Sequence, residues 1–363
     1  MASAGPTGPT FLERFARSGR ESRGAWRSVR HHVARWDVQT GLSRQRRSPS
    51  PQVPVALVAA PAPPGSSAPR PSTTKVWTQA ARPQTLGAAV APVVVGTAMA
   101  AEAGAFHAPS AACALLGAVL IQIGTNFSND YRDFLKGADR PSREGPTRAT
   151  QAGWVSPQAM RRATMGAFAL ASAGGLYLIW RGGWPVLAVG VASIASGVWY
   201  TAGRWSLAYL GLADLFVLVF FGPVAVGGTF YVQALYVSAP VLGAGLAPGL
   251  LATGILLVNN LRDREEDARV GKKTLVVRFG RSLGRALYAA CMAGAALVPV
   301  VLVARTGRHA AALAASGVAL LGGGLLASRL FRAATPAAFR PLLGRTGQLL
   351  VAYSLAFAVG WNL

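Results

Sequence analysis

The sequence predicts an all-α, polytopic membrane protein, and three observations support this fold class. The chain has 363 residues, of which 52% are hydrophobic and only 13% are charged, unlike an ordinary soluble domain. Several apolar runs approach the roughly twenty residues that a helix needs to cross a bilayer. Basic residues gather in the N-terminal tail and in alternate loops, as membrane topology requires. We therefore expect about nine transmembrane helices in a bundle.

Residues 1–74 differ in composition from the rest of the chain. They hold eleven Arg and three acidic residues, and Ser48–Thr74 is rich in Pro and Ser, which favours a disordered linker. An Arg-rich, acid-poor leader also fits an organelle transit peptide, whereas a solvated tail or a start assigned too far upstream is the other interpretation. We assign residues 1–74 to a disordered basic tail and residues 75–363 to a membrane-embedded domain.

The membrane-embedded domain begins with a short amphipathic segment. Trp77–Arg82, just before Pro83, predicts an entry helix with Trp77 at the membrane interface. The nine spans that we expect after it are Gln84–Ala103, Ala111–Ser128, Ala163–Trp180, Trp184–Thr201, Leu212–Tyr231, Ala239–Asn259, Arg285–Ala304, Ala310–Ala327 and Gly347–Trp361.

The loop charges predict the orientation in the membrane. Nine spans put the N-terminus on the side of the loops that follow the second, fourth, sixth and eighth spans. The opposite side holds only Arg181, Arg305 and Arg308, so the positive-inside rule places the N-terminus and the basic loops in the cytoplasm or its organelle equivalent. The net charge of +23 thus reflects topology, and we expect no nucleic-acid partner.

Carboxylates outside the tail gather in two stretches that follow apolar runs. The chain has thirteen acidic residues; three lie in the tail, and eight of the other ten lie in Asn126–Thr150 and Asn259–Arg278. On a helix, the polar residues of each stretch share one face: Asn126, Asp130 and Asp133 in the first, and Asn259, Asp263 and Asp267 in the second.

Clustered oxygen ligands suit a hard divalent cation, and Mg²⁺ prefers a few carboxylates together with waters and substrate phosphates. The four His and two Cys lie away from both stretches, which argues against softer metals. Asp139 joins the first face only if the helix breaks near Gly137. Carboxylates interleaved with Arg and Lys are what a diphosphate leaving group requires. One acidic–basic loop is usually solvated surface, but two on the same membrane face favour a shared site.

The residues of these stretches resemble a known family. N-x-x-N-D-Y-x-D-F-x-K-G-x-D, from Asn126, and the following G-P-x-R-A-T-Q resemble the first motif of the UbiA-type intramembrane aromatic prenyltransferases. N-N-L-R-D-x-x-x-D-x-x-x-G-K-K-T-L, from Asn259, resembles their second motif. W-x-Q-A-A-R-P-x-T-L, from Trp77, and F-G-P-V-A-V-x-G-T-x-Y-V-Q, from Phe221, are similar to the 1,4-dihydroxy-2-naphthoate polyprenyltransferase branch of menaquinone biosynthesis. The resemblance runs from Trp77 to the C-terminus.

Two departures from the wider family fit that branch. Asp133 and Asp139 are six residues apart where the general motif has four, and Asn259 stands where the general motif often has Asp. Both departures leave the ligand roles of Asp139 and Asn259 open.

The resemblance implies a nine-helix bundle around a cavity that opens sideways to lipid, with two Mg²⁺ ions that grip the diphosphate of a polyprenyl donor. The implied metal-binding residues are Asn126, Asp130, Asp133, Asp139, Asn259, Asp263 and Asp267. The implied diphosphate-binding residues are Lys136, Arg143, Lys272 and Lys273, with Arg148 as a catalytic residue beside the aspartates. Ionisation would give an allylic cation, which the naphthoate would attack before it loses CO₂ to give demethylmenaquinol. Arg148 or Lys273 would orient the naphthoate carboxylate.

Several alternatives stay open from the sequence. A UbiA-type enzyme for homogentisate, hydroxybenzoate or chlorophyllide is one, and a cation transporter is another, although its charges would lie at mid-membrane depth. A bacterial cytoplasmic membrane with the site on the cytoplasmic side is expected, with a chloroplast membrane as the alternative. The length of the prenyl chain and the oligomeric state are not predicted.

A few side chains near the site have two interpretations. Tyr131 either stabilises the allylic cation through its ring face or packs. Asp214 either supports the site or, as we favour, complements the positive end of a helix dipole. We expect Trp199, Tyr200, Trp205 and Tyr209 to form an interfacial aromatic belt rather than a substrate cage.

Overall fold

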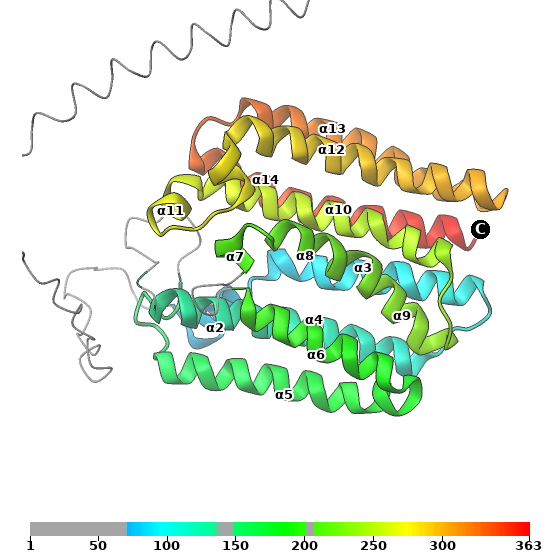
Figure 1. The fold of residues 1–363 in the computed structure, drawn as a ribbon, viewed down its shortest axis with the longest axis horizontal. Helices are drawn as coiled ribbons and strands as arrows, with labels where there is room; N and C mark the ends of the chain where they lie inside the picture. Colours follow the sequence, from blue (N-terminus) through cyan, green and yellow to red (C-terminus); the bar gives the residue numbers. More distant parts are fainter. Residues whose placement is uncertain (1–70, 136, 138–147, 201–206) are drawn as a thin grey trace, which may run out of the picture. The chain divides into compact units, whose positions relative to one another are not determined.

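The computed structural model describes residues 71–135, 137, 148–200 and 207–363, all within one compact unit, Ala62–Leu363. Every regular element in these residues is a helix (Figure 1), so the all-α prediction is confirmed. The predicted tail, residues 1–70 of it, lies outside the described residues. The helices are α2 (Thr73–Ala81), α3 (Pro83–Glu102), α4 (Ala108–Leu135), α5 (Pro157–Gly182), α6 (Trp184–Trp199), α7 (Leu207–Leu210), α8 (Ala213–Val219), η2 (Phe220–Val224), α9 (Ala225–Ala234), α10 (Ala239–Arg262), α11 (Arg264–Arg269), α12 (Leu275–Thr306), η3 (Ala310–Ala312), α13 (Leu313–Arg332) and α14 (Pro336–Trp361).

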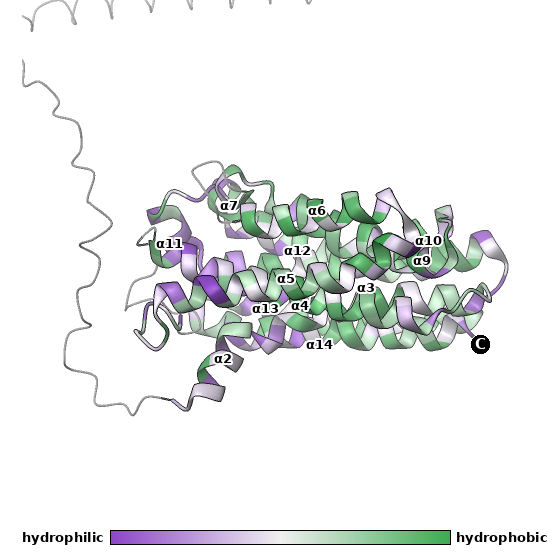
Figure 2. Cartoon of the chain, turned by 90° about the horizontal axis from the view of Figure 1, so that it is seen from below, coloured by the Kyte–Doolittle hydropathy of each residue, from purple (hydrophilic) through white to green (hydrophobic). Residues whose placement is uncertain are grey.

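The described helices account for the predicted membrane spans. Eight helical segments are long and apolar enough to cross a membrane, and α6 is a shorter apolar helix of 16 residues. Figure 2 shows hydrophobic residues along the middle of the bundle and hydrophilic residues at the end that carries α11. The chain is therefore an integral membrane protein. Its helices cover the predicted spans, but α12 begins at Leu275 and α14 at Pro336, well before the predicted starts at Arg285 and Gly347.

Helix boundaries follow local sequence signals. The Ser156 hydroxyl accepts a bond from the Ala159 amide (3.2 Å) and Pro157 opens α5, the usual start of a helix. The predicted entry helix is α2, whose Trp77 ring packs edge-on against Phe127 of α4 at 5.5 Å between centroids. This contact places α2 against the end of α4 that carries the acidic motif.

The span Ala213–Ala234 is interrupted where it crosses α10. Gly222 has non-helical torsion angles (φ −111°, ψ −113°) and Pro223 follows it within η2. A Cβ atom on Gly245 of α10 would lie 2.8 Å from the Pro223 nitrogen, so the two backbones touch directly. Glycine is required there because small residues permit such close approach in membranes. The kink carries Phe220 and Phe221 to the wall of a cavity.

The main core lies among α3, α10, α12 and α14. Its largest fully buried side chains include Tyr288, Tyr353 and Phe357, and the Tyr288 hydroxyl bonds to Thr346 Oγ1 at 3.0 Å between α12 and α14. Because this half of the bundle is tightly packed, it holds the end of α10 in a fixed position opposite α4.

Candidate active site

The ends of α4 and α10 meet at one cavity of about 310 Å³. Asp130 and Asp133 reach it from the last turns of α4, and Asp263 and Asp267 from the α10–α11 junction. All four side chains are buried. The structure thus brings together two acidic stretches that are more than a hundred residues apart in the chain.

The first half of the cavity is built on α4, which continues past the predicted end at Ser128 to Leu135. Asp130 accepts bonds from the backbone amides of Ala149 (Oδ2, 3.0 Å) and Thr150 (Oδ1, 3.2 Å). Backbone N–H groups stabilise the ionised carboxylate, so Asp130 fixes the segment that begins at Arg148 against α4.

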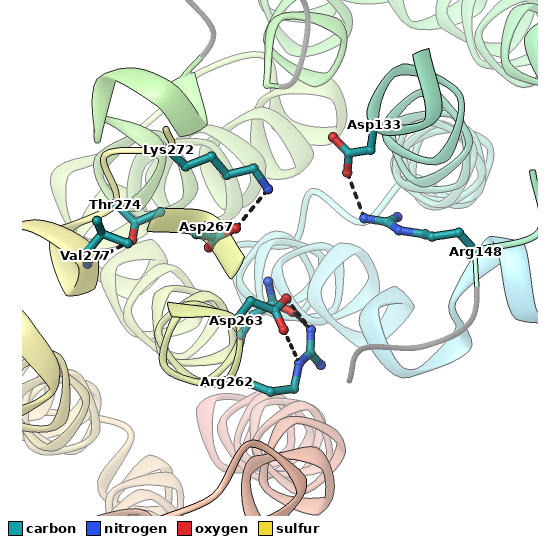
Figure 3. Close-up of polar contacts among 9 residues, drawn as sticks. Asp133, Arg148, Arg262, Asp263, Asp267, Lys272, Thr274 and Val277 are labelled. Carbon is teal, nitrogen blue, oxygen red and sulfur yellow. Dashed lines mark hydrogen bonds and ion pairs between the residues drawn. The ribbon is translucent and has the colours of Figure 1, made fainter. Parts of the chain in front are cut away.

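Three aspartates form ion pairs with cations that also line the cavity (Figure 3). Arg148 Nη2 lies 2.9 Å from Asp133 Oδ2, and Lys272 Nζ lies 3.0 Å from Asp267 Oδ1. Arg262 donates to both oxygens of Asp263, at 2.7 Å each. Buried carboxylates need such partners, because removal of one partner leaves an uncompensated charge. The site is therefore a set of paired charges at the ends of apolar helices.

The asparagine that begins each acidic motif, Asn126 in the first and Asn259 in the second, also lines the cavity. Asn126 Nδ2 donates to the Ala81 carbonyl (2.9 Å) and to Thr85 Oγ1 (3.1 Å). Asn259 Oδ1 accepts from Arg262 Nη2 at 2.6 Å. Asn126 thus attaches the α2–α3 junction to α4, and Asn259 accepts a hydrogen bond from the same arginine, Arg262, that pairs with Asp263.

The predicted second face does not lie on one continuous helix, because α10 ends at Arg262 and Asp263 is its C-cap. The Asp267 amide still bonds to the Asp263 carbonyl at 2.8 Å, so the turn is kept and the three side chains reach the same cavity. Lys273, by contrast, is exposed and does not line the cavity. Lys136, Asp139 and Arg143 lie outside the described residues.

The structure decides between the two interpretations of several side chains. Tyr131 packs against the small core cluster of Val76, Phe127 and Met160 and does not line the cavity, which favours packing. Asp214 lies in the first turn of α8, buried beside the cavity rather than in it, as the dipole interpretation expects.

The prediction that Tyr200 belongs to an interfacial aromatic belt is wrong. Tyr200 is the C-cap residue of α6, and it lines the cavity because α6 ends beside the cavity. Trp199 is 44% exposed, in keeping with an interfacial position, and Trp205 lies outside the described residues.

Burial raises the pKa of the Tyr209 phenol; Lys272 opposes this rise, and Asp133 and Asp267 add to it. The Tyr209 hydroxyl therefore stays protonated at neutral pH.

The sequence reasoning missed further residues of the cavity wall. Arg262 is not among the predicted site residues, although its place beside Asp263 within the N-N-L-R-D motif is a signal that could have identified it. Asn260 is 3% exposed and its Nδ2 has no hydrogen-bond partner in the described part of the chain. Arg82 lines the cavity from the α2–α3 junction. Asn260 and Arg82 both fall within motifs of the sequence, N-N-L-R-D and W-x-Q-A-A-R-P-x-T-L, but only the packing of the helices brings them to the cavity.

The donor set of the cavity consists of oxygen and cationic nitrogen atoms. Within the described ranges, no three His, Cys, Asp or Glu side chains lie close enough together to form a metal site by themselves. The four aspartates stand as two pairs on two helix ends, and carboxylate oxygens are ligands for a hard divalent cation that completes its shell with water and phosphate. The residues present fit Mg²⁺ bound together with a diphosphate.

Comparisons with known proteins identify the family. Residues 89–345 match the model of the UbiA prenyltransferase family. The chain is 38% identical over 298 residues to the 1,4-dihydroxy-2-naphthoate octaprenyltransferase of Escherichia coli (strain K12), a match that covers 80% of this chain and 96% of that protein. It is 39% identical over 282 residues to the enzyme of the same name from Mycobacterium tuberculosis, covering 78% and 95%.

A solved structure shares the fold. A UbiA homolog from Archaeoglobus fulgidus, bound to GPP and Mg²⁺, superimposes with a TM-score of 0.54 at 18% sequence identity and covers 78% of this chain and 99% of that chain. At this identity the likeness supports the architecture of the helices alone.

Proposed function

Because the chain belongs to the UbiA prenyltransferase family, we propose that it transfers a polyprenyl group from polyprenyl diphosphate to 1,4-dihydroxy-2-naphthoate. The products are diphosphate, CO₂ and demethylmenaquinol, an intermediate of menaquinone biosynthesis. One observation carries the proposal: two distant aspartate pairs and the cations Arg148, Arg262 and Lys272 line one cavity. The names of the curated relatives support the naphthoate as the acceptor.

We assign the binding of the donor diphosphate to the charged end of the cavity. Asp130 and Asp133 would hold one Mg²⁺ and Asp263 and Asp267 a second, with Asn126 and Asn259 beside them. Bound Mg²⁺ supplies positive charge that stabilises the departing diphosphate. The homolog from Archaeoglobus fulgidus was solved with GPP and Mg²⁺, and we propose ligands of the same class for this chain.

The residues of the chain prepare the reacting groups. Arg148 and Lys272 pair with aspartates and can turn toward phosphate oxygens as negative charge develops on them. The C–O bond of the donor breaks and its electron pair leaves with the diphosphate. The ring carbon of the naphthoate that carries the carboxylate forms the new C–C bond, and the electron pair of the C–CO₂ bond then restores aromaticity as CO₂ leaves.

Apolar side chains complete the site on the side away from the aspartates. Phe216 and Phe220 stack with ring centroids 5.8 Å apart and an interplanar angle of 7°, and both line the cavity. Such a wall excludes water from an allylic cation, which would otherwise be hydrolysed. The wall also offers aromatic faces to that cation.

We place the protein in the bacterial cytoplasmic membrane with the charged end on the cytoplasmic side, by the positive-inside rule. A transporter is disfavoured because the aspartates lie at the ends of α4 and α10 rather than in mid-span.

The test is prenyl transfer by the full chain in membrane vesicles, with labelled polyprenyl diphosphate and 1,4-dihydroxy-2-naphthoate. Labelled demethylmenaquinol and CO₂ are expected in equal amounts, EDTA should stop their formation, and added Mg²⁺ should restore it. Asp130→Ala and Asp263→Ala should each abolish transfer. Full activity in both variants would contradict the diphosphate site, and transfer to homogentisate or hydroxybenzoate alone would contradict the acceptor.

A further inference from the structure

The cavity has two walls of different chemistry. Aromatic and aliphatic side chains from α8, η2 and α10 form the apolar wall, among them Phe216, Phe220 and Ile255. A second group of lining residues, which we call the polar wall, is polar although it lies within membrane-spanning helices that also contribute apolar residues such as Ile121. Its members are Gln122 and Thr125 of α4, Ser193 and Ser196 of α6, and Arg82 at the α2–α3 junction. An isoprenoid chain needs only the first wall, so the second wall is suited to a polar acceptor.

Arg82 has an unusual backbone conformation at this junction. It is both the C-cap residue of α2 and the N-cap residue of α3, and its torsion angles (φ 54°, ψ 70°) lie in the left-handed region. A residue other than glycine adopts this conformation only at an energetic cost. Such strain persists only where the surroundings fix it, and it is concentrated at functional sites.

The surroundings of Arg82 do fix it. The Arg82 carbonyl accepts bonds from the Thr85 amide and from Thr85 Oγ1, both at 2.9 Å. Asn126 Nδ2 binds the preceding carbonyl, Ala81 O, at 2.9 Å, and Gln122 Nε2 reaches Thr85 Oγ1 at 3.4 Å. These side chains of α4 hold the α2–α3 corner against the polar wall.

The position of the corner along α4 matters for the reaction. Asn126 and Gln122 lie one and two turns before Asp130 on α4, which is about 6 and 12 Å at 1.5 Å per residue. The α2–α3 corner therefore meets α4 about one turn before Asp130, and Arg82 lines the cavity from there. The cations Arg148, Arg262 and Lys272 instead lie on the aspartates themselves.

We infer that Arg82 binds the carboxylate of the aromatic acceptor and thereby selects aromatic acids as substrates. This inference rests on the proposed function. A guanidinium group binds a carboxylate through two parallel N–H···O bonds, and the polar wall supplies hydroxyl and amide groups for the ring oxygens. The sequence suggested Arg148 and Lys273 for this role. Lys273 is less suited because it does not line the cavity, and Arg148 is less suited because it lies at Asp133, which the proposed function assigns to the metal and the diphosphate.

The test measures steady-state constants for the full chain in vesicles. Arg82→Gln should raise the KM for the naphthoate about 10- to 100-fold, the value of a charge-assisted hydrogen bond, with the KM for the donor unchanged. Arg82→Lys, which keeps the charge but loses the two-pronged geometry, should give a smaller rise. Arg162→Gln, at an exposed arginine of α5 that does not line the cavity, is the matched control and should leave both constants unchanged.

Inhibition constants then test whether the carboxylate is the group that Arg82 binds. The unaltered protein should bind 1-hydroxy-2-naphthoate at least tenfold more tightly than 1-naphthol, and in Arg82→Gln the two should bind about equally. An equal loss for both inhibitors, or a rise in donor KM alone, would overturn the inference. Thermal unfolding of Arg82→Gln and Arg82→Lys checks the fold. If the unaltered protein modifies no aromatic acid, the proposed function itself fails.

Discussion

Arg148 Nη2 lies 2.9 Å from Asp133 Oδ2, and the two side chains are only 8% and 5% exposed. Asp130, one turn earlier on α4, binds the amides of Ala149 and Thr150. The segment after Arg148 is thus attached to α4 through two aspartates. The same carboxylates serve the architecture and, in the proposed function, the metal and diphosphate.

Arg148→Gln should lower the free energy of unfolding by about 3–5 kcal/mol, since it leaves Asp133 buried without its cation. Arg148→Gln combined with Asp133→Asn should recover much of this loss but no activity. Thermal unfolding in detergent measures both effects. Arg281→Gln is the control, because the Arg281–Glu265 pair (2.8 Å) is 31% and 48% exposed and should contribute less than about 1 kcal/mol. Equal losses in both variants would contradict the prediction.

Two carboxylates in the second acidic stretch should behave differently. Asp267 is buried and lines the cavity, whereas Glu265 is half exposed and pairs with Arg281 away from it. Asp267→Asn should lower kcat/KM by on the order of 100-fold, the usual loss for a group that stabilises developing charge. Glu265→Gln should change it less than about twofold. A comparable loss in Glu265→Gln would mean that overall charge, not the cavity, determines activity.

Asn260→Leu should separate stability from activity. The Asn260 amide is 3% exposed, lines the cavity, and has an Nδ2 without a hydrogen-bond partner among the described residues. A buried unsatisfied donor costs about 1–3 kcal/mol, so its removal should raise the unfolding temperature. Activity should fall because the amide then cannot donate to a substrate. A variant that is both less stable and fully active would contradict this role.

Gly249→Ala should disturb the apolar wall. A Cβ atom there would collide with the Leu218 carbonyl and would lie 3.0 Å from Gly222 Cα, pushing η2 away from α10 at a cost of about 1–3 kcal/mol. Gly317→Ala in α13 is the matched control, because no atom lies within 4 Å of its Cβ position. We expect a lower unfolding temperature only in Gly249→Ala; the same loss in both variants would show a general intolerance of larger residues.

The sequence by itself determined the membrane fold and the positions of its spans. Hydropathy and helix-start signals such as Ser156–Pro157 act over a few neighbouring residues, so they can be read without the tertiary structure. It also determined that Asn126, Asp130 and Asp133 share a face, since helical periodicity requires this. The hydropathy did not predict that α4 continues to Leu135, because the apolar run ends before the helix does.

The tertiary structure alone decided which charges meet. Among the described residues, Arg148 and not Lys273 forms an ion pair with an aspartate. Tyr200 lines the cavity, and Arg82 lines it from a strained corner between α2 and α3. The physical reason is that an ion pair or a cavity wall depends on distances between helices. Those distances are set by close contacts such as that of Gly245 with Pro223, which pair residues far apart in the chain and leave no periodic signal in it.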